Sequence, residues 1–528
     1  PDVTQPTVRP GQKFSYTITF PDPGVFWYHP HTRDDYGQEL GLYGNYLVSF
    51  KDKKELASVN KEVPLIIDDI LLDSKGDIAP FAHEGINRTL SGRIGNVMLI
   101  NGDSNYSLDV KKGEIVRFFI TNASNARIYN LTLTGARLKL IGSDDSLYSH
   151  EEYVENILLS PSERAIVEAY FPDAGTYLLR NETPKKLYRL GMFTVGSESV
   201  KNSYVEEFNI RKTHSIGLPD SFVEKMTERN PDKRLKLTVL LTGDASMHDH
   251  SNHGGPTSFL FNTVEAHGTG VIPKGILWED DMEMMNEMTN SENTFWKIVD
   301  MDTNMENEKI SWAFEKGSFV KIRIWNDKAS QHPMQHPVHF HGNRFAVLTE
   351  DGVQNQNLVW KDTVLIPTGS TYDILLDASN VGTWMAHCHI SEHLHAGMMF
   401  SYRILEKGDP LLLVKPVVKS SSQTPNQEET ASHGEGMNMQ GMNTQAQPFD
   451  ESLPHGHDAD GSSVRQDMHD SKGFDESLPH GHDADGSSIL PGISQSGPAG
   501  FPKSAKIFIS LLLMAGLSFW VRKLILKP

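Results

Sequence analysis

Short runs of alternating apolar and polar residues, separated by Gly and Pro, dominate the chain up to about residue 405. The runs FSYTITF at 14–20 and GNYLVSF at 44–50 have the period of two that is typical of half-buried strands. A second series lies between Val63 and about Gly196, and a third between about Lys236 and Leu405. Long stretches with a helical period are scarce. The pattern therefore predicts an all-β protein of tandem β-sandwiches.

These series set the expected domain boundaries. We expect the end of one β domain at 1–58, a second domain at 59–204 and a third at 205–410. Between 411 and 504, Ser, Gln, Asn, Gly, Asp and His replace the apolar pattern, which predicts a disordered linker. The linker repeats FDESLPHGHDADGSS at 449–463 and 474–488. Its His and Met residues allow weak copper capture, although a duplicated polar linker is the simpler interpretation.

An apolar run stands near the end of the chain. The uncharged stretch 507–521 is shorter than the roughly 20 residues of a spanning helix, but the flanking Lys506 and Arg522 can snorkel. We expect a membrane anchor, a transmembrane helix at 505–526, with a terminal amphipathic helix as the alternative. More basic residues follow the run than precede it, which predicts that the body of the protein lies on the extracytoplasmic face of the cell membrane.

Net charge and cysteine content narrow the possible functions. The formal net charge is -19, which argues against binding to nucleic acid, because that requires basic patches. Cys388 is the one cysteine of the chain, so an intrachain disulfide is excluded. A lone cysteine is commonly an inert buried residue. The residues around Cys388 indicate a different role.

The segment HCHISEHLHAGMM places histidines on both sides of Cys388. Neighbouring side chains of a strand point to opposite faces, so Cys388 faces one way while His387 and His389 face the other. One backbone can then serve two metal sites. The Cys388 thiolate, the His393 imidazole and the Met398 thioether are ligands typical of blue copper, which requires one further histidine.

Two further motifs supply more imidazoles. In HPVHFHG, His336 can complete the blue copper site, whereas His339 and His341 share a face and can join the second site. The motif WYHPH adds His29 and His31 with the same spacing. A single His-x-His pair is more often solvated or structural, and zinc is a common metal for histidine clusters. Neither a structural pair nor a zinc site explains histidines on both sides of the cysteine.

In this order, the three motifs resemble the laccase and cuprous-oxidase branches of the multicopper oxidases, over residues 1 to about 406. GRIGNVMLING and WEDDMEMMNEMTNSENTFWKIVD resemble the middle and third domains of three-domain members. The resemblance implies cupredoxin-like Greek-key β-sandwich domains and four copper ions in the complete protein. It implies type 1 ligands His336, Cys388, His393 and axial Met398, type 2 ligand His339, and binuclear type 3 ligands His29, His31, His341, His387 and His389.

Two departures from the family pattern affect the cluster. The family's HxHG motif, which supplies two more histidines, does not precede Tyr28, so we expect an amino-terminally truncated sequence. Ligands from another subunit, or a cluster that does not work, would also account for the missing motif. In addition, Leu394 stands where cuprous-oxidase relatives often carry an acid that is associated with proton delivery. Glu392 and Asp35 are the candidates for that role.

The resemblance implies a laccase-like oxidase that takes single electrons through an exposed edge of His393 and passes them by Cys388 to His387 and His389, where O2 is reduced to water. The reductant is a phenolic or other small aromatic molecule, or a metal ion in an alternative Cu(I)/Fe(II) metallo-oxidase role. Methionines of the segment 282–288 favour Cu(I), although methionine also fills cores. An electron-transfer copper protein and, less favoured, a copper nitrite reductase are rival functions. Neither of these rivals has a use for histidines on both sides of the cysteine.

Overall fold

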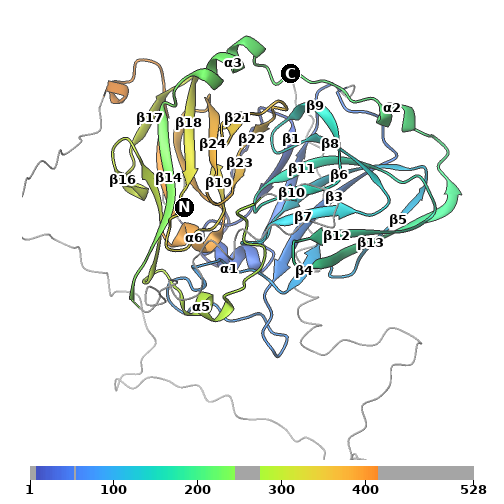
Figure 1. Ribbon diagram of the computed structural model, residues 1–528, viewed down its shortest axis with the longest axis horizontal. Coiled ribbons are helices and arrows are strands. Elements are labelled where there is room, and N and C mark those ends of the chain that lie inside the picture. Colours follow the sequence, from blue (N-terminus) through green and yellow to red (C-terminus); the bar gives the residue numbers. More distant parts are fainter. Residues whose placement is uncertain (1–6, 53–54, 244–273, 414–528) are drawn as a thin grey trace, which may run out of the picture. The chain divides into compact units, whose positions relative to one another are not determined.

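Figure 1 shows a computed structural model of the chain, which describes residues 7–52, 55–243 and 274–413. The chain divides into two units, 1–418 with 501–528 and 419–500, and the described residues all belong to the first. The predicted linker beyond residue 413 and the predicted anchor at 505–526 lie outside the described residues. Within the described ranges, no helix is long and apolar enough to cross a membrane. The anchor and the extracytoplasmic location therefore stay predictions.

The middle of the chain forms two β-sheets that share one apolar core, to which Ile120, Leu131 and Phe193 contribute. The first sheet has the order β4-β3-β6-β11-β8-β9, with β3 (Lys61–Ile70), β4 (Val97–Ile100), β6 (Ile115–Asn122), β8 (Arg137–Gly142), β9 (Leu147–Val154) and β11 (Arg164–Tyr170). The second has the order β10-β7-β12-β13-β5, with β5 (Tyr106–Lys112), β7 (Tyr129–Leu133), β10 (Ile157–Leu159), β12 (Gly175–Glu182) and β13 (Leu187–Ser199).

The carboxyl-terminal part of the described chain also forms two sheets over one core, which includes Trp296, Ile322 and Phe400. The larger sheet has the order β16-β15-β14-β18-β24-β20-β21, with β22 on β20, from β14 (Lys233–Leu241), β15 (Thr294–Asp300), β16 (Met305–Glu306), β18 (Ser318–Asn326), β20 (Phe345–Glu350), β21 (Val353–Gln354), β22 (Trp360–Lys361) and β24 (Thr371–Ala378). The smaller has the order β17-β26-β25-β19-β23, from β17 (Trp312–Glu315), β19 (His336–Phe340), β23 (Thr363–Ile366), β25 (Gly382–Cys388) and β26 (Met399–Leu405).

The two pairs of sheets have related connections. Among the strands of residues 61–199, called the middle domain below, β3 pairs in parallel with β6 and β5 with β13, while the remaining pairs are antiparallel. Among the strands of residues 233–405, called the third domain below, β14 pairs in parallel with β18 and β17 with β26. One parallel pair in each sheet of both domains indicates one architecture used twice. The described residues are mostly β-sheet, as the alternating pattern predicts.

The helices are short, in agreement with the scarcity of helical periodicity. They are α1 (Asp34–Glu39), α2 (Val205–Asn209), α3 (Asp220–Glu228), α5 (Glu283–Met288) and α6 (Ser391–His395), with the 3-10 turns η3 (Asn307–Lys309) and η4 (Pro410–Leu413). Two of them matter for the site: α6 directly follows the strand that carries Cys388, and α1 follows His31.

The amino-terminal residues form one small sheet, in which β1 (Gly24–Tyr28) pairs with β2 (Gly44–Val48). The predicted strand at 14–20 is wrong, because these residues form no regular element. Alternation in the sequence becomes a strand only where a neighbouring strand offers hydrogen bonds, and among the described residues none pairs with 14–20. Phe14, Tyr16 and Ile18 are accordingly exposed.

A buried arginine at the start of β11 joins three parts of the chain. The Arg164 guanidinium donates two hydrogen bonds of 2.6 Å to the carboxylate of Asp362, which comes from the third domain. Its Nε donates to the carbonyl of Val25 in β1 at 2.8 Å. Asp144 and Asp145 also lie within 4 Å of the same guanidinium. Arg164 thus neutralises a group of acids between the domains.

Replacing Arg164 with Met is expected to lower the free energy of unfolding by about 3–5 kcal/mol, because Asp362 loses the buried guanidinium that holds both of its carboxylate oxygens. Urea unfolding followed by tryptophan fluorescence measures the change. Arg180→Met is the matched control, since Arg180 is partly exposed and lies 3.7 Å from Glu182. The control should lose less than about 1 kcal/mol. Equal losses in the two variants would contradict a special role for Arg164.

Candidate metal centre

The side chains of Cys388, His336 and His393 meet at a buried point at the ends of β19 and β25. Cys388 Sγ lies 3.6 Å from His336 Nδ1 and 3.7 Å from His393 Nδ1, and the two nitrogens are 3.3 Å apart. Bonds of about 2.0–2.3 Å to one central metal ion give a planar triangle with edges of about 3.5 Å. The three donor atoms therefore fit a trigonal copper site.

The surroundings of this triangle favour a metal over an ordinary buried thiol. Burial raises the pKa of Cys388, so the thiolate needs a nearby cation to form. Burial also lowers the pKa of His336 to about 3, which keeps its imidazole neutral and able to coordinate. Met398 is fully buried beside them, and its carbonyl accepts a 3.1 Å hydrogen bond from the amide of Cys388.

We expect an exposed edge of His393 for electron uptake, but the structure does not show one. This residue is fully buried, its Nε2 donates to the carbonyl of Leu90 at 3.2 Å, and Trp296 stacks on its ring with centroids 4.0 Å apart. The prediction of an exposed His393 edge is therefore wrong. The physical reason is that the segment 88–92 of the middle domain covers this face, and Trp296 Nε1 holds it by a 2.7 Å bond to the carbonyl of Thr89.

Six imidazoles from three distant motifs gather on the opposite side of Cys388. His339 of β19 lies opposite His387 of β25 in the antiparallel register. The ligand atoms of His31, His341 and His387 lie within 4.8 Å of one another, with 3.0 Å between the Nε2 atoms of His341 and His387. His29 and His389 form a second group, with their Nε2 atoms 3.2 Å apart.

Backbone carbonyls orient several of these rings. The Nδ1 atoms of His29, His339 and His387 donate to the carbonyls of Pro30 at 3.1 Å, Asp362 at 2.9 Å and Cys388 at 2.7 Å. A proton fixed on Nδ1 leaves Nε2 free to bind a metal. The bond from His387 to the carbonyl of Cys388 also links the cluster directly to the thiolate site.

Burial lowers the pKa of several imidazoles of the cluster and so disfavours their protonated forms. It lowers the pKa of His29 to about 3, and it is the main reason that the pKa values of His341, His387 and His389 lie well below the usual value. Neighbouring imidazoles add to the effect, because a proton on one ring disfavours a proton on the next. Imidazole nitrogens that face one another at these short distances are better placed to bind copper than to bind one another.

Beside the cluster, Asp34, Asp35 and His395 form a group of titratable side chains that is not predicted as a group from the sequence. His395 pairs with Asp34, while Asp35 accepts a 2.9 Å bond from Arg33, so both acids have partners. Asn125 donates to the carbonyl of Asp35 at 2.8 Å and to Glu392 at 3.4 Å. Both candidates for proton delivery are buried, Glu392 in α6 and Asp35 in α1. Their role in proton delivery stays a prediction.

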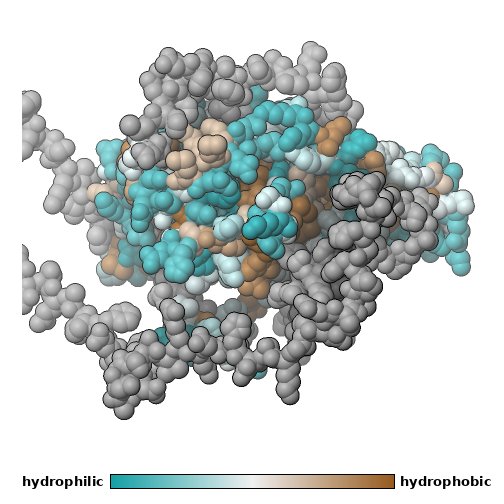
Figure 2. Space-filling model, turned by 90° about the horizontal axis from the view of Figure 1, so that it is seen from below, coloured by the Kyte–Doolittle hydropathy of each residue, from teal (hydrophilic) through white to brown (hydrophobic). Residues whose placement is uncertain are grey.

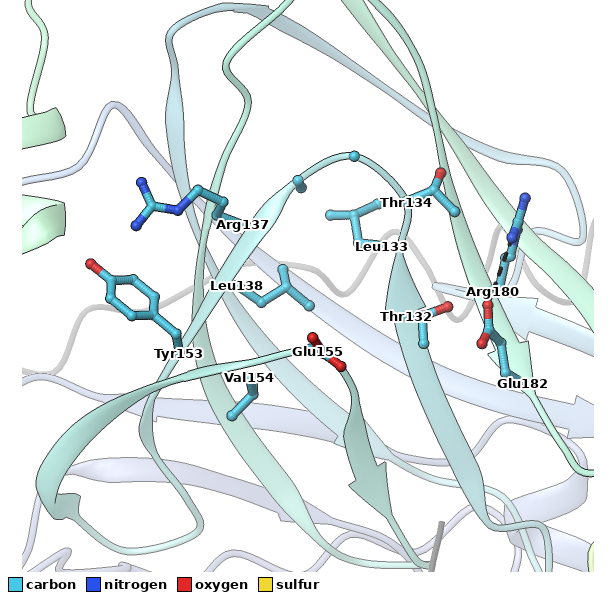
Figure 3. Close-up of a pocket in the computed structure, with 12 residues that line it drawn as sticks. Thr132, Leu133, Thr134, Arg137, Leu138, Tyr153, Val154, Glu155, Arg180 and Glu182 are labelled. Atoms are coloured by element: carbon cyan, nitrogen blue, oxygen red, sulfur yellow. Dashed lines mark ion pairs between the residues drawn. The ribbon is translucent and has the colours of Figure 1, made fainter. Parts of the chain in front are cut away.

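A surface hollow of about 520 Å³ lies elsewhere, in the middle domain. Figure 3 shows Arg137 beside the ring of Tyr153, and Arg180 paired with Glu182. The lining residues come from β7, β8, β9 and β12 and the turns next to them, and none is His, Cys or Met. This hollow is separate from the metal ligands.

Comparisons with known proteins agree with this geometry. Family models for multicopper oxidases match residues 1–53, 62–200 and 279–408. A multicopper oxidase of Staphylococcus epidermidis is 25% identical over 407 residues, which cover 75% of this chain and 72% of the relative. An iron transport multicopper oxidase of Gibberella zeae is 22% identical over 447 residues, covering 79% of this chain and 65% of the relative.

A solved structure shares the fold. The multicopper oxidase of Campylobacter jejuni, described as a metallo-oxidase, superimposes with a TM-score of 0.52 at 21% identity, covering 73% of this chain and 72% of that structure. The fold, the thiolate triangle and the gathered imidazoles define a copper oxidoreductase. This chain belongs to the multicopper oxidase family, whose members use type 1, type 2 and type 3 copper with O2.

Proposed function

We propose that this protein is a metal-ion oxidase that takes single electrons from Cu(I) or Fe(II) at the Cys388 site and passes them to O2 at the histidine cluster. The observation that carries the proposal is the buried His393, covered by a segment that is tied to the methionine-rich helix α5. When bound, copper supplies the one-electron steps and the four-electron reduction of O2 to two waters.

Hydrogen bonds tie α5 to the residues that cover His393. The amide of Leu90 donates to Thr289 Oγ1 at 3.0 Å, and the amide of Ser91 donates to Asn286 Oδ1 at 3.0 Å. The carbonyl of Leu90 in turn accepts the bond from His393. A short series of covalent and hydrogen bonds therefore runs from α5 to the thiolate site, and an electron donor at α5 need not touch the imidazole.

The methionines of this segment divide between the core and the surface. Met282 and Met285 pack against the core of the third domain. Met284 and Met288 are 78% and 60% exposed, and the acids Glu283 and Glu287 lie between and beside them. Thioethers are soft ligands that select Cu(I), and the exposed carboxylate of Glu283 attracts cations, whereas Glu287 pairs with Arg88. The surface of α5 therefore suits a soft metal ion better than an aromatic ring.

Part of α5 is accessible, because Met284 and Met288 are exposed. The helix lies toward the bottom of Figure 1, and the view from below in Figure 2 shows hydrophobic residues among hydrophilic ones on that face.

The relatives described as an iron transport oxidase and as a metallo-oxidase support a metal-ion substrate. A laccase role, with a phenolic reductant, is the second candidate, and a laccase is among the relatives at 25% identity.

Replacing both exposed methionines, Met284→Leu with Met288→Leu, is expected to raise KM for Cu(I) about tenfold and to leave turnover of a phenolic dye unchanged. Leucine keeps the volume of the side chain but removes the sulfur ligand. Oxygen uptake under saturating and limiting Cu(I) measures the effect. Met192→Leu is the matched control, because Met192 is 40% exposed on β13 of the middle domain. An unchanged KM for Cu(I), with a phenol as the faster substrate, would favour the laccase role instead.

A further inference from the structure

Ser162 occupies an unusual position in the loop that precedes β11. It is fully buried, and its φ of 72° lies in the left-handed region that residues with a side chain rarely adopt. Its amide donates to the carbonyl of Asn122 at 2.9 Å, and its own carbonyl accepts a 2.8 Å bond from Arg164. These contacts hold the strained backbone and direct the Ser162 hydroxyl out of the middle domain.

The Ser162 hydroxyl joins two segments that carry candidate ligands. It accepts a 3.0 Å hydrogen bond from Trp27 Nε1 of β1, and it is hydrogen bonded to the Thr363 hydroxyl of β23 at 3.2 Å. One oxygen atom of the middle domain therefore meets the amino-terminal segment and the third domain at the same point.

Each of these partners contacts imidazoles of the cluster. The Trp27 indole stacks on His29 with centroids 4.3 Å apart and an interplanar angle of 23°, and its centroid lies 5.3 Å from that of His389. Thr363 Oγ1 lies 3.0 Å from His339 Nδ1. Rotation of the Trp27 indole would move His29, and displacement of Thr363 would change the hydrogen bonding of His339.

We propose that Ser162 is a positioning residue that fixes the orientation of His29 relative to His339 through Trp27 and Thr363. These two imidazoles lie more than three hundred positions apart in the chain, and the middle domain contributes neither of them. Partners beyond the ligands typically change metal affinity or activity by about 10–100-fold when they are removed. The inference rests on the proposed copper-binding role of the cluster imidazoles.

Ser162→Ala tests this role, because it removes the hydroxyl and keeps the Cβ. We expect the variant to lose cluster copper at a roughly tenfold lower chelator concentration than the wild type and to change the electron paramagnetic resonance signal of type 2 copper. The visible band of the thiolate site should stay unchanged, since Ser162 contacts none of its ligands. Ser160→Ala is the matched control, because the Ser160 hydroxyl is equally buried but bonds Glu163 at 2.8 Å.

Trp27→Phe tests the same connection from the amino-terminal segment. It keeps an aromatic ring beside His29 and removes the N–H that Ser162 accepts, so it should shift the same two signals in the same direction. Copper retention and a type 2 signal equal to the wild type in both variants would overturn the positioning role. A wild-type protein that binds no cluster copper would instead overturn the proposed function.

Discussion

Cys388→Ser is expected to abolish the intense visible absorption of the copper-loaded protein and to lower oxidase turnover by at least about 1000-fold. The serine oxygen is hard and is not a thiolate, so the trigonal site with His336 and His393 loses the ligand that creates the copper–sulfur transition. Visible absorption and oxygen uptake with Cu(I) measure the two effects. Histidine-bound copper in the cluster should remain in the variant.

Met398→Leu serves as the control for that substitution, because it keeps the thiolate and both imidazoles and changes a buried residue of similar volume. The control should stay blue. A visible band that survives in Cys388→Ser, or one that is lost equally in Met398→Leu, would contradict the assignment of Cys388 as the central ligand.

His387→Gln is expected to have the second-largest effect on oxygen uptake. This effect distinguishes the imidazole cluster from the thiolate site. His387 belongs to the three-imidazole group with His31 and His341, whereas its neighbour Cys388 belongs to the thiolate triangle. Glutamine approximates the size of the imidazole but is a poor copper ligand. We expect the blue band to persist while oxygen uptake falls by about 100-fold or more.

The control for this prediction is His83→Ala, which removes an exposed histidine of the middle domain. Copper content, visible absorption and oxygen uptake should all match the wild type in that protein. If His387→Gln retained full oxygen uptake, the imidazole cluster would not be the site of O2 reduction. Loss of the blue band together with oxygen uptake would mean that the two sites are not independent.

The ligand-bearing residues can be found from the sequence because their relations are local. The spacing in HCH and in HPVHFHG, combined with the alternation of strand side chains, places His387 and His389 opposite Cys388. The structure places Cys388 with His336 and His393. It gathers His387 with His31 and His389 with His29 on the other side. No comparable local signal exists for the residues that support them.

The supporting residues come from distant parts of the chain. Leu90, Ser162 and Arg164 of the middle domain contact residues that lie more than one hundred positions away, such as His393, Trp27 and Asp362. A serine before a strand or a leucine in a loop has no periodicity that predicts such a partner. For this reason the covering of His393 could not be predicted, and the exposed edge that the family resemblance implies is not found in the structure.

The composition of the segment 282–288 does not predict which of its methionines are buried. The methionines of 282–288 are compatible with either a core or a soft-metal surface, and the structure divides them, because Met282 and Met285 pack against the core while Met284 and Met288 are exposed. The turn of α5 determines which of these methionines face the core. A helix of this length has too few residues for its apolar face to be predicted from the sequence.

Anomalous diffraction at the copper absorption edge, from crystals of the copper-loaded protein, tests the central claim most directly. We predict one peak inside the triangle of Cys388, His336 and His393, and further peaks among the imidazoles that include His341 and His387. Copper bound elsewhere with both of these positions empty would contradict the account.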